Sequence, residues 1–192
     1  MLFTSDMHLG HANIAAYCNR PGFKPEYYKD GRWVGDAERQ EVEDKMSDTL
    51  IHNWNSRVKP DDTVFHVGDF CSHGPVKGVR GSRSKAQEWE RRLNGQVIHI
   101  RGNHDSNNSV KVAAESLKLW FGKRTWLLVH IPPDKVPVDI DVVLCGHVHQ
   151  AWKHKVIDGR PVINVGTDVW DWKPITKQEL IVYCDRLLSS HI

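Results

Sequence analysis

The chain lacks the features that mark membrane-spanning, secreted and disulfide-stabilised proteins. No apolar run approaches the roughly 20 residues that cross a bilayer. The first residues contain neither a basic region nor an apolar core, so we expect no secretory signal, no membrane partner and a cytoplasmic location. The four cysteines are widely spaced and form no Cys-x-x-Cys pair, which excludes the usual pattern of a structural zinc site. We expect reduced thiols, mostly buried.

The chain also lacks a strong charge of either sign, an internal repeat, a low-complexity tract and a linker. Its formal net charge is +2 over 192 residues, which is too small to indicate a protein that coats nucleic acid. Hydrophobic residues make up 40% and charged residues 26%, as in an ordinary globular protein. A chain of this length can bury one substantial core. We therefore expect a single domain over residues 1–192 and leave its oligomeric state open.

Against these absences, twelve histidines are many for this length. Five β-rich apolar runs, over residues 2–5, 63–67, 96–100, 125–129 and 141–145, are each followed closely by aspartate, asparagine or histidine. Polar side chains at the carboxyl ends of strands can converge in one crevice. A lone histidine at one such junction is weak evidence, but five junctions together indicate a metal site. The ligand-type residues at these junctions are Asp6 and His8, Asp69, Asn103 and His104, His130, and His147 and His149.

The remaining elements are predicted from periodicity and turn chemistry. Apolar residues at helical spacing predict a helix over residues 36–55, and weaker patterns predict a helical turn at 12–17 and helices at 85–93 and 109–119. A loop is expected at 74–84 and a hairpin around Asp158-Gly159. Thr176 and Glu179 have the spacing of a capping box. We nevertheless interpret the apolar residues 180–183 as a last strand.

The type of ligand narrows the metal. Carboxylate, imidazole and amide donors without thiolate suit Mn²⁺, Fe²⁺, Zn²⁺ or Ni²⁺ better than Ca²⁺. These donors exceed what one tetrahedral ion needs, and they suit two ions that share a carboxylate. Two ions about 3.5–4 Å apart can hold a bridging hydroxide and clamp a phosphate ester during in-line displacement. Hydrolysis of a phosphoester is the reaction that this set of donors serves best.

These motifs, in this order, resemble those of the calcineurin-like metallophosphoesterase superfamily, in particular its small bacterial and phage-type members. They are Asp6-x-His8, Gly68-Asp69, Gly102-Asn103-His104-Asp105, His130 and Gly146-His147-x-His149. The resemblance implies an α/β fold, a four-layer α-β-β-α sandwich with a dinuclear metal site at the edge of the sheets. It also implies a division of the ligands: Asp6, His8 and His149 on one ion, Asn103, His130 and His147 on the other, and Asp69 bridging both.

The resemblance assigns roles to residues beside the ligands as well. His104 would protonate the leaving oxygen or steady the phosphate, and Asp105 could fix the ring of His104. His11, Asn13 and Arg101 lie close enough to the motifs in sequence to touch a phosphate, although a solvated surface charge explains Arg101 equally well. The Asp-Arg-Gly sequence of the protein serine/threonine phosphatase branch is missing after Gly68. That departure argues against a dedicated phosphoprotein phosphatase.

We therefore expect a metal-dependent phosphoesterase that hydrolyses phosphodiesters or small phosphomonoesters by attack of a metal-bridging hydroxide. The preferred class is phosphodiesterase, with a small phosphoester or a nucleotide as substrate. Of the four candidate metals, Mn²⁺ is expected to support activity best in vitro. The loop at residues 21–36 is the predicted substrate-selecting element, and nothing in its sequence names a substrate.

A nuclease that acts on DNA or RNA with the same dinuclear centre is the alternative. Basic residues gather at positions 77, 80, 83, 85, 91, 92 and 101 and could follow a nucleic-acid backbone. A solvated helix face explains them better in a nearly neutral chain, so nucleic acid is the less favoured partner. A catalytically silent binding module is a third hypothesis. The complete set of ligands argues against it.

Several conspicuous residues fall outside the motifs. The histidines at positions 52, 66, 99, 154 and 191 match no motif position and are interpreted as structural. His73 stays open because it follows Asp69 by four residues. Trp170 and Trp172 could wall the pocket and stack on a flat group, or they could pack as core or lid residues.

Overall fold

The structure is a computed structural model, and it describes residues 1–72, 85–106 and 109–189. The loop predicted at 74–84 lies outside the described residues, as do His73, Lys77, Arg80, Arg83 and His191. Among the described residues, none of the helices combines the length and the apolarity that crossing a membrane requires. None of the four cysteines forms a disulfide in this part of the chain, and three of them are buried, as expected for reduced thiols.

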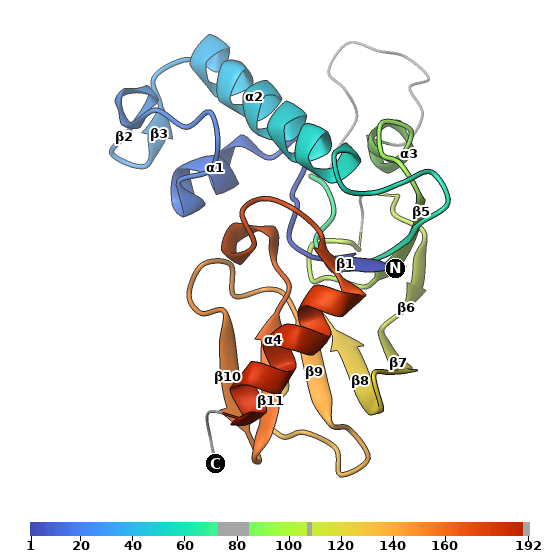
Figure 1. Cartoon of the computed structure of the whole chain (residues 1–192). Coiled ribbons are helices and arrows are strands. Elements are labelled where there is room, and N and C mark those ends of the chain that lie inside the picture. Colours follow the sequence, from blue (N-terminus) through green and yellow to red (C-terminus); the bar gives the residue numbers. More distant parts are fainter. Residues whose placement is uncertain (73–84, 107–108, 190–192) are drawn as a thin grey trace.

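Two five-stranded sheets form the centre of the molecule (Figure 1). In the first sheet, β1, β4, β5 and β6 run parallel, and β12 pairs antiparallel with β1. Its strands, in spatial order, are β12 (Ile175–Thr176), β1 (Leu2–Thr4), β4 (Thr63–Val67), β5 (Gln96–Ile100) and β6 (Val112–Ala114). The first strand predicted from the sequence and the two that follow it are thus neighbours in one sheet.

The second sheet is mixed. Its central pairs, β11 with β9 and β9 with β8, are parallel, and antiparallel strands flank them on both sides. The order is β10 (His154–Ile157), β11 (Arg160–Asn164), β9 (Val142–Cys145), β8 (Arg124–Val129) and β7 (Ser116–Phe121). The hairpin predicted around Asp158-Gly159 is confirmed as β10 and β11.

The main core lies between the two sheets. Phe3 of β1 and Phe65 of β4 share a hydrophobic cluster with Leu128 of β8 and Leu144 of β9. Alternate residues of the second sheet, such as Val143, face the opposite way and belong to a different cluster, as the pleat of a strand requires. The sheets therefore pack face to face and hold their strand ends in fixed positions relative to each other.

Helices cover the outer face of the first sheet, and two of them carry most of this packing. They are α1 (Ala12–Cys18) and α2 (Asp36–Asn55), so the long helix predicted at 36–55 is confirmed and the predicted turn at 12–17 is a helix of seven residues. The buried side chains of α2, among them Met46 and Leu50, pack in one cluster with Val64 of β4. Their spacing of four residues gives α2 the apolar stripe that holds it on the sheet.

The outer face of the second sheet is packed differently from the prediction. Val136 and Ile140, from the segment between β8 and β9, contact Leu127, Val143 and Val162 on this face. This segment contains three prolines, which prevents a continuous helix. The mixed α/β fold with two central sheets agrees with the sequence prediction, whereas the described residues show no outer helix in this cluster, so the four-layer arrangement is not confirmed.

Two predicted elements are wrong. Residues 109–119, predicted as a helix, contain β6 and the start of β7, because Leu117, Leu119 and Phe121 alternate with exposed residues at the period of a strand. Residues 180–183, predicted as a strand, belong to α4 (Lys177–Ser189). The apolar run is part of a helical stripe, with Leu180 and Cys184 both facing the core between the sheets.

The capping box at the start of α4 is present. The Thr176 backbone N–H and hydroxyl each donate to Glu179 Oε2 at 2.8 Å, and the Glu179 backbone N–H donates to Thr176 Oγ1 at 3.2 Å. The remaining short elements are α3 (Lys85–Glu90), which ends before the predicted position 93, the hairpin β2 (Tyr28–Lys29) and β3 (Arg32–Trp33), and two 3₁₀ turns, Pro25–Tyr27 and Thr167–Val169.

Candidate metal centre

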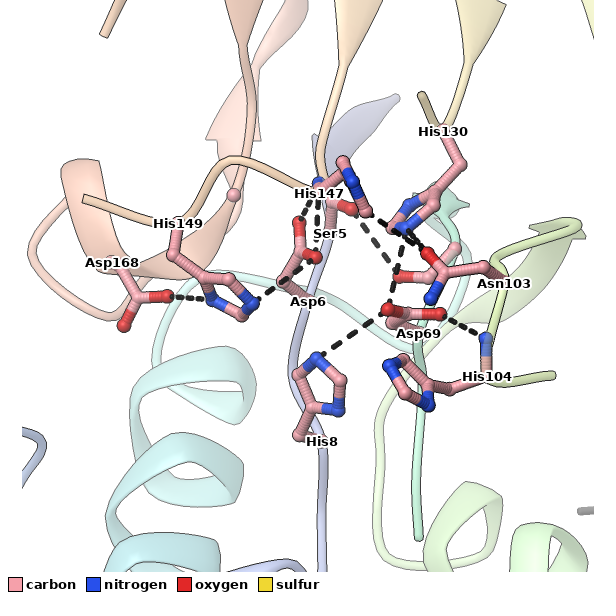
Figure 2. A network of polar contacts seen from close by, with 12 residues as sticks. Ser5, Asp6, His8, Asp69, Asn103, His104, His130, His147, His149 and Asp168 are labelled. Atoms are coloured by element: carbon pink, nitrogen blue, oxygen red, sulfur yellow. Dashed lines mark hydrogen bonds and ion pairs between the residues drawn. The ribbon is translucent and has the colours of Figure 1, made fainter. Parts of the chain in front are cut away.

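The structure brings all seven predicted ligands together where strands of both sheets end (Figure 2). Asp6 follows β1, Asp69 follows β4 and Asn103 follows β5, so three loops of the first sheet contribute one ligand-bearing turn each. From the second sheet, His130 follows β8, and His147 lies in the loop after β9. Because the sheets pack face to face, these loops meet at one edge of the sandwich, as side chains at strand carboxyl ends can.

The first group of ligand atoms belongs to Asp6, His8 and His149. One donor atom from each of these residues lies within 4.8 Å of the others. His149 Nε2 is 4.0 Å from Asp6 Oδ1, and the rings of His8 and His149 stack with their centroids 5.3 Å apart. These are the three residues that the resemblance assigns to one ion.

The second group centres on the side-chain amide of Asn103. His130 Nε2 and His147 Nδ1 each lie 3.0 Å from Asn103 Oδ1. The rings of His130 and His147 meet edge to face with their centroids 5.4 Å apart. The structure thus also gathers the three residues that the resemblance assigns to the other ion.

Asp69 lies between the two groups. Its Oδ2 atom is 3.5 Å from His8 Nε2 and 3.3 Å from His130 Nε2, while its Oδ1 atom accepts a hydrogen bond from the His104 backbone N–H at 2.9 Å. Asp69 also forms a compact group with Asp6 and His130. A carboxylate in this position can contribute to two neighbouring ions.

The histidine rings are oriented as metal ligands should be. His130 donates from Nδ1 to the Val67 carbonyl at 2.8 Å, and His149 Nδ1 lies 2.8 Å from Asp168 Oδ2. Each of these bonds turns the other ring nitrogen, Nε2, toward the carboxylates of the site. His8 Nε2 is buried and has no hydrogen-bond partner among the described residues. A divalent cation fits this set of donors, because it would give these nitrogen lone pairs a partner.

Electrostatics also favour a cation at this position. Burial alone would lower the pKa of His130, but the hydrogen bond to Asp69 and the charges of Asp6 and Asp69 outweigh it and raise that pKa to about 8. Burial alone would raise the pKa of Asp69, but the hydrogen bond from His130 and the charges of His130 and His8 hold it well below its usual range. The negative charges of Asp6 and Asp69 therefore keep the His130 imidazole protonated, and a metal ion can replace that proton.

The backbone of the site is unusual. Five of the seven predicted ligands have positive φ angles in the left-handed region: Asp6 (56°), His8 (48°), Asp69 (59°), His147 (70°) and His149 (47°). Residues other than glycine rarely adopt this conformation, and it persists where surrounding contacts impose it. Contacts with the rest of the protein therefore set the backbone conformation of these loops. The conformational preferences of the residues themselves do not explain it.

Glycines in the motifs permit the close approach of the loops. A Cβ atom on Gly68 would overlap the ring of His130, and one on Gly102 would overlap the backbone and carboxylate of Asp69. A Cβ atom on Gly146 would overlap the side chains of Ser5 and Asp6. These positions need glycine because another part of the site occupies the space.

His104 and Asp105 have separate environments. The His104 side chain is on an exposed residue, and its ring meets that of His8 edge to face with centroids 5.6 Å apart. The Asp105 carboxylate is buried and accepts hydrogen bonds from the backbone N–H groups of Asp69, Phe70 and Gly102. These bonds join the loops after β4 and β5, so fixing the ring of His104 stays a prediction.

The three predicted substrate-binding residues differ in their surroundings. The ring of His11 lies 5.8 Å from that of His8, beside the ligands. Asn13 accepts a hydrogen bond from the Trp33 indole at 2.6 Å, which joins α1 to the β2–β3 hairpin. Arg101 donates to Glu115 at 2.5 Å in an exposed ion pair. Of the three, His11 has the contact that places it beside a predicted ligand.

Sequence reasoning missed an ion pair next to the ligands. Asp168, in the 3₁₀ turn after β11, accepts hydrogen bonds from both Arg20 and His149. Arg20 follows α1 and its C-cap residue Asn19, which has the left-handed conformation (φ 49°). The two residues are 148 positions apart, so no local pattern could link them. A signal was present in Asp168 itself, which follows a buried strand as the predicted ligands do.

The other conspicuous residues have structural contacts. Trp170 donates from its indole to the Asn164 carbonyl at 2.7 Å and packs edge to face on Tyr183, while Trp172 packs against the cluster beneath α2. His66 and His99 are buried side by side on β4 and β5. These contacts agree with packing roles, which was one of the two interpretations of the tryptophans.

Fold and site together define a two-sheet α/β protein that gathers carboxylate, imidazole and amide donors at the edge of its sheets. The chain belongs to the calcineurin-like phosphoesterase superfamily, because the model of that domain matches residues 46–185. The proteins of this superfamily are classed as hydrolases that act on phosphoester bonds. The motif of Asp6 and His8 precedes the matched residues, and the structure places it with the others.

Relatives match most of the chain. The uncharacterized protein MJ1445 of Methanocaldococcus jannaschii is 30% identical over 186 residues, which cover 95% of this chain and 89% of the relative. The Gene 66 protein of Mycobacterium phage L5 is 30% identical over 115 residues, or 60% of this chain and 44% of that protein. The crystal structure of AQ665, a protein of unknown function from Aquifex aeolicus, has a TM-score of 0.63 and 25% identity, covering 97% and 98% of the two chains.

Proposed function

We propose that the protein is a metal-dependent phosphoesterase with two divalent cations, and that it hydrolyses phosphodiesters in preference to small phosphomonoesters. The observation that carries the proposal is the position of Asp69. Its carboxylate lies between the Asp6, His8 and His149 group and the Asn103, His130 and His147 group, within 3.5 Å of a histidine nitrogen from each. Two groups of donors around one shared carboxylate suit two ions.

Two bound cations would lower the pKa of a water molecule, so that it attacks phosphorus near neutral pH, and would neutralise the phosphate. The donors in the two groups include no thiolate, which suits Mn²⁺, Fe²⁺, Zn²⁺ or Ni²⁺. We expect Mn²⁺ to support activity best in vitro. The protein's own contribution is to hold the seven donors in place, which the backbone contacts of the loops achieve.

His104 is the proposed proton donor to the leaving oxygen. Its backbone N–H is bound to Asp69, and its ring lies beside that of His8 on an exposed residue. The side chain can therefore reach a substrate at the edge of the centre without being one of the seven donors. His11, whose ring also lies next to His8, is placed to contact the same substrate.

The preference for a diester rests on two arginines near the site in the described part of the chain. Arg20 directs its guanidinium to Asp168 and to the carbonyls of Asp6 and Met7, and Arg101 pairs with Glu115. Both guanidinium groups are already engaged. A phosphomonoester carries about two negative charges at neutral pH and a diester one, so engaged arginines favour the diester.

The described residues give no support to the nuclease alternative. Of the basic residues on which it depends, Arg92 pairs with Asp48 and Arg101 with Glu115, both at 2.5 Å. The side chains at positions 77, 80, 83 and 85 lie outside the description. Small phosphodiesters and nucleotides are therefore the proposed substrates.

The test is hydrolysis of two model esters by metal-free protein reloaded with Mn²⁺. We expect bis-p-nitrophenyl phosphate to be cleaved faster than p-nitrophenyl phosphate, and Asp69→Asn to remove most of this activity. Asp139→Asn is the matched control, since Asp139 pairs with Lys118 at the surface. Absence of hydrolysis of both esters, or full activity in Asp69→Asn, would overturn the proposal, and a preference for the monoester would overturn its substrate class.

A further inference from the structure

A buried ion pair lies beside one of the two ligand groups. The side chains of Arg20 and Asp168 are 0% and 1% exposed. Arg20 donates from Nε to Asp168 Oδ1 at 2.8 Å and from one terminal nitrogen to Oδ2 at 2.7 Å, in a bidentate arrangement. Removing two charges from water costs as much free energy as their attraction returns. Stability alone is therefore a poor reason for this pair.

Both members of the pair contact the same ligand group. Asp168 Oδ2 lies 2.8 Å from His149 Nδ1. Arg20 donates to the backbone carbonyl of Asp6 at 2.6 Å and to that of Met7, the residue between Asp6 and His8, at 2.8 Å. In the described part of the chain, the side-chain hydrogen bonds of this pair, apart from those between its own two members, lead to the group of Asp6, His8 and His149. The side chains of the other group bond to Asn103 and to the carbonyl of Val67. The two groups meet where the His147 backbone N–H donates to the Asp6 carboxylate at 3.0 Å.

These contacts support two features of the ligand group: the ring orientation of His149 and the left-handed backbone of Asp6 and His8. Asp168 holds the Nδ1 side of His149, so that Nε2 points toward Asp6 (Figure 2). Asp6 and His8 have positive φ angles, and Arg20 binds the carbonyls of the two peptide units that join them. A left-handed backbone at such residues persists only where surrounding contacts impose it. Arg20 supplies two of these contacts.

We infer that Arg20 and Asp168 are positioning residues for one metal site only, the site formed by Asp6, His8 and His149. Arg20 holds the backbone that carries Asp6 and His8, and Asp168 orients His149. The inference rests on the proposed function, because it presupposes two ions. Partners of this kind usually change metal affinity by about 10- to 100-fold.

Cys18 is a further donor near this pair. One donor atom each from Cys18, His149 and Asp168 lies within 4.8 Å of the others. Both carboxylate oxygens of Asp168 are already bound by Arg20, whose charge opposes a further cation at this point. The geometry therefore assigns Asp168 to orienting His149 and not to a third ion.

The test measures how many Mn²⁺ ions bind and whether the electron spins of the bound ions are coupled. Metal-free full-length protein is titrated with Mn²⁺ in a calorimeter, and the loaded protein is examined by electron paramagnetic resonance. We expect the wild type to bind two ions with a coupled spectrum. Asp168→Asn should bind one ion with unchanged affinity and the other about 10- to 100-fold more weakly, with the spectrum of isolated Mn²⁺. Asp139→Asn, which breaks a surface ion pair of 2.6 Å, should behave as wild type.

A second variant separates positioning from folding. Asp168→Asn leaves Arg20 as an unpaired buried charge, which by itself can unfold a protein. The double variant Arg20→Met with Asp168→Asn removes both charges, and its folding is checked by circular dichroism. Loss of one ion from this folded variant supports the inference.

Three outcomes would overturn the inference, and a fourth would overturn the proposed function on which it rests. Retention of both ions in the folded variants, equal weakening of both ions, or failure of both variants to fold would each overturn the inference, the last because the pair would then be structural. A wild-type protein that binds fewer than two ions would instead overturn the proposed function. The two failures are therefore distinguishable in one series of titrations.

Discussion

The carboxylate of Asp105 accepts a hydrogen bond from the backbone N–H of Asp69 at 2.8 Å. It accepts two more, from Phe70 at 3.1 Å and from Gly102 at 2.9 Å. Asp105 therefore ties the loop that carries the proposed bridging carboxylate to the loop that carries Asn103. The residue next to the proposed acid His104 thus holds the loops of two proposed metal ligands directly.

Replacing Asp105 by asparagine should weaken both metal sites. An amide keeps the size of the carboxylate but has one acceptor oxygen, so at least one of the three backbone N–H groups loses its partner. We expect the free energy of unfolding to fall by about 1–3 kcal/mol, and Mn²⁺ affinity to fall at both sites because Asp69 is shared. Urea denaturation and calorimetric titration measure the two effects. A variant with normal stability and metal content but a slow rate would show that Asp105 acts through His104.

Asn103→Ala and His104→Ala should have opposite signatures. Asn103 Oδ1 is the point at which His130 and His147 meet, so its removal should weaken the ion of that group while the other ion stays bound. His104 contributes a ring outside the seven donors, and its removal should leave two ions bound and lower kcat by about 10²- to 10⁴-fold. Metal analysis and ester hydrolysis on the same samples make the comparison. The reverse pattern would exchange the two roles.

Gly146→Ala should damage the site through crowding. The added Cβ atom would overlap the side chains of Ser5 and Asp6, and overpacking of this kind typically costs about 1–3 kcal/mol. We expect lower stability together with weaker binding of the ion that Asp6 holds. The control is Gly159→Ala, where a Cβ atom meets nothing within 4 Å although φ is 72°. It should lose stability alone, and equal metal affinity in both variants would refute the crowding argument.

The metal-free protein should lose stability as the pH falls below about 6.5. Burial, and then the neighbouring His99, hold the pKa of His66 well below its usual value, and burial does the same for His8. Below the unfolded pKa, the unfolded chain binds protons that the folded chain does not, so each such group removes up to about 1.4 kcal/mol per pH unit. His130 and His149, whose pKa values are raised to about 8 and about 10, are protonated in the folded state throughout this range. They oppose the loss of stability only near pH 6.5, where the unfolded histidines are partly neutral, and add no slope well below it.

His66→Leu isolates the contribution of one group. Its unfolding free energy, measured by urea denaturation in a chelator, should depend less steeply on pH between 6.5 and 5 than that of the wild type. The difference should approach one proton, because His66 has no exposed surface. Identical slopes in the two proteins would mean that His66 takes up its proton in the folded state as well.

The group of polar side chains proposed as metal ligands could be predicted from the sequence because each position is defined locally. Asp69 and Asn103 directly follow short apolar strands or a glycine after them, and parallel strands bring such positions to one edge. The long helix at 36–55 was equally easy to predict, since apolar residues recur at helical spacing over twenty residues. Short segments were not. Residues 109–119 contain too few turns to separate a helix from alternating strand residues, and residues 180–183 form only one turn of α4.

The residues that hold the predicted ligands in place could be recognised only from their positions in space. Asp105 is next to His104 in the chain, yet its hydrogen bonds go to Asp69 and Phe70, on a neighbouring strand's loop. Arg20 and Asp168 meet across 148 positions. By itself, the sequence determined which polar side chains follow the strands and gather at the edge of the sheets, because strand ends and glycines mark them. Only the tertiary structure decided what holds them, because a buried polar group takes whichever partner the packing of the sheets brings within reach.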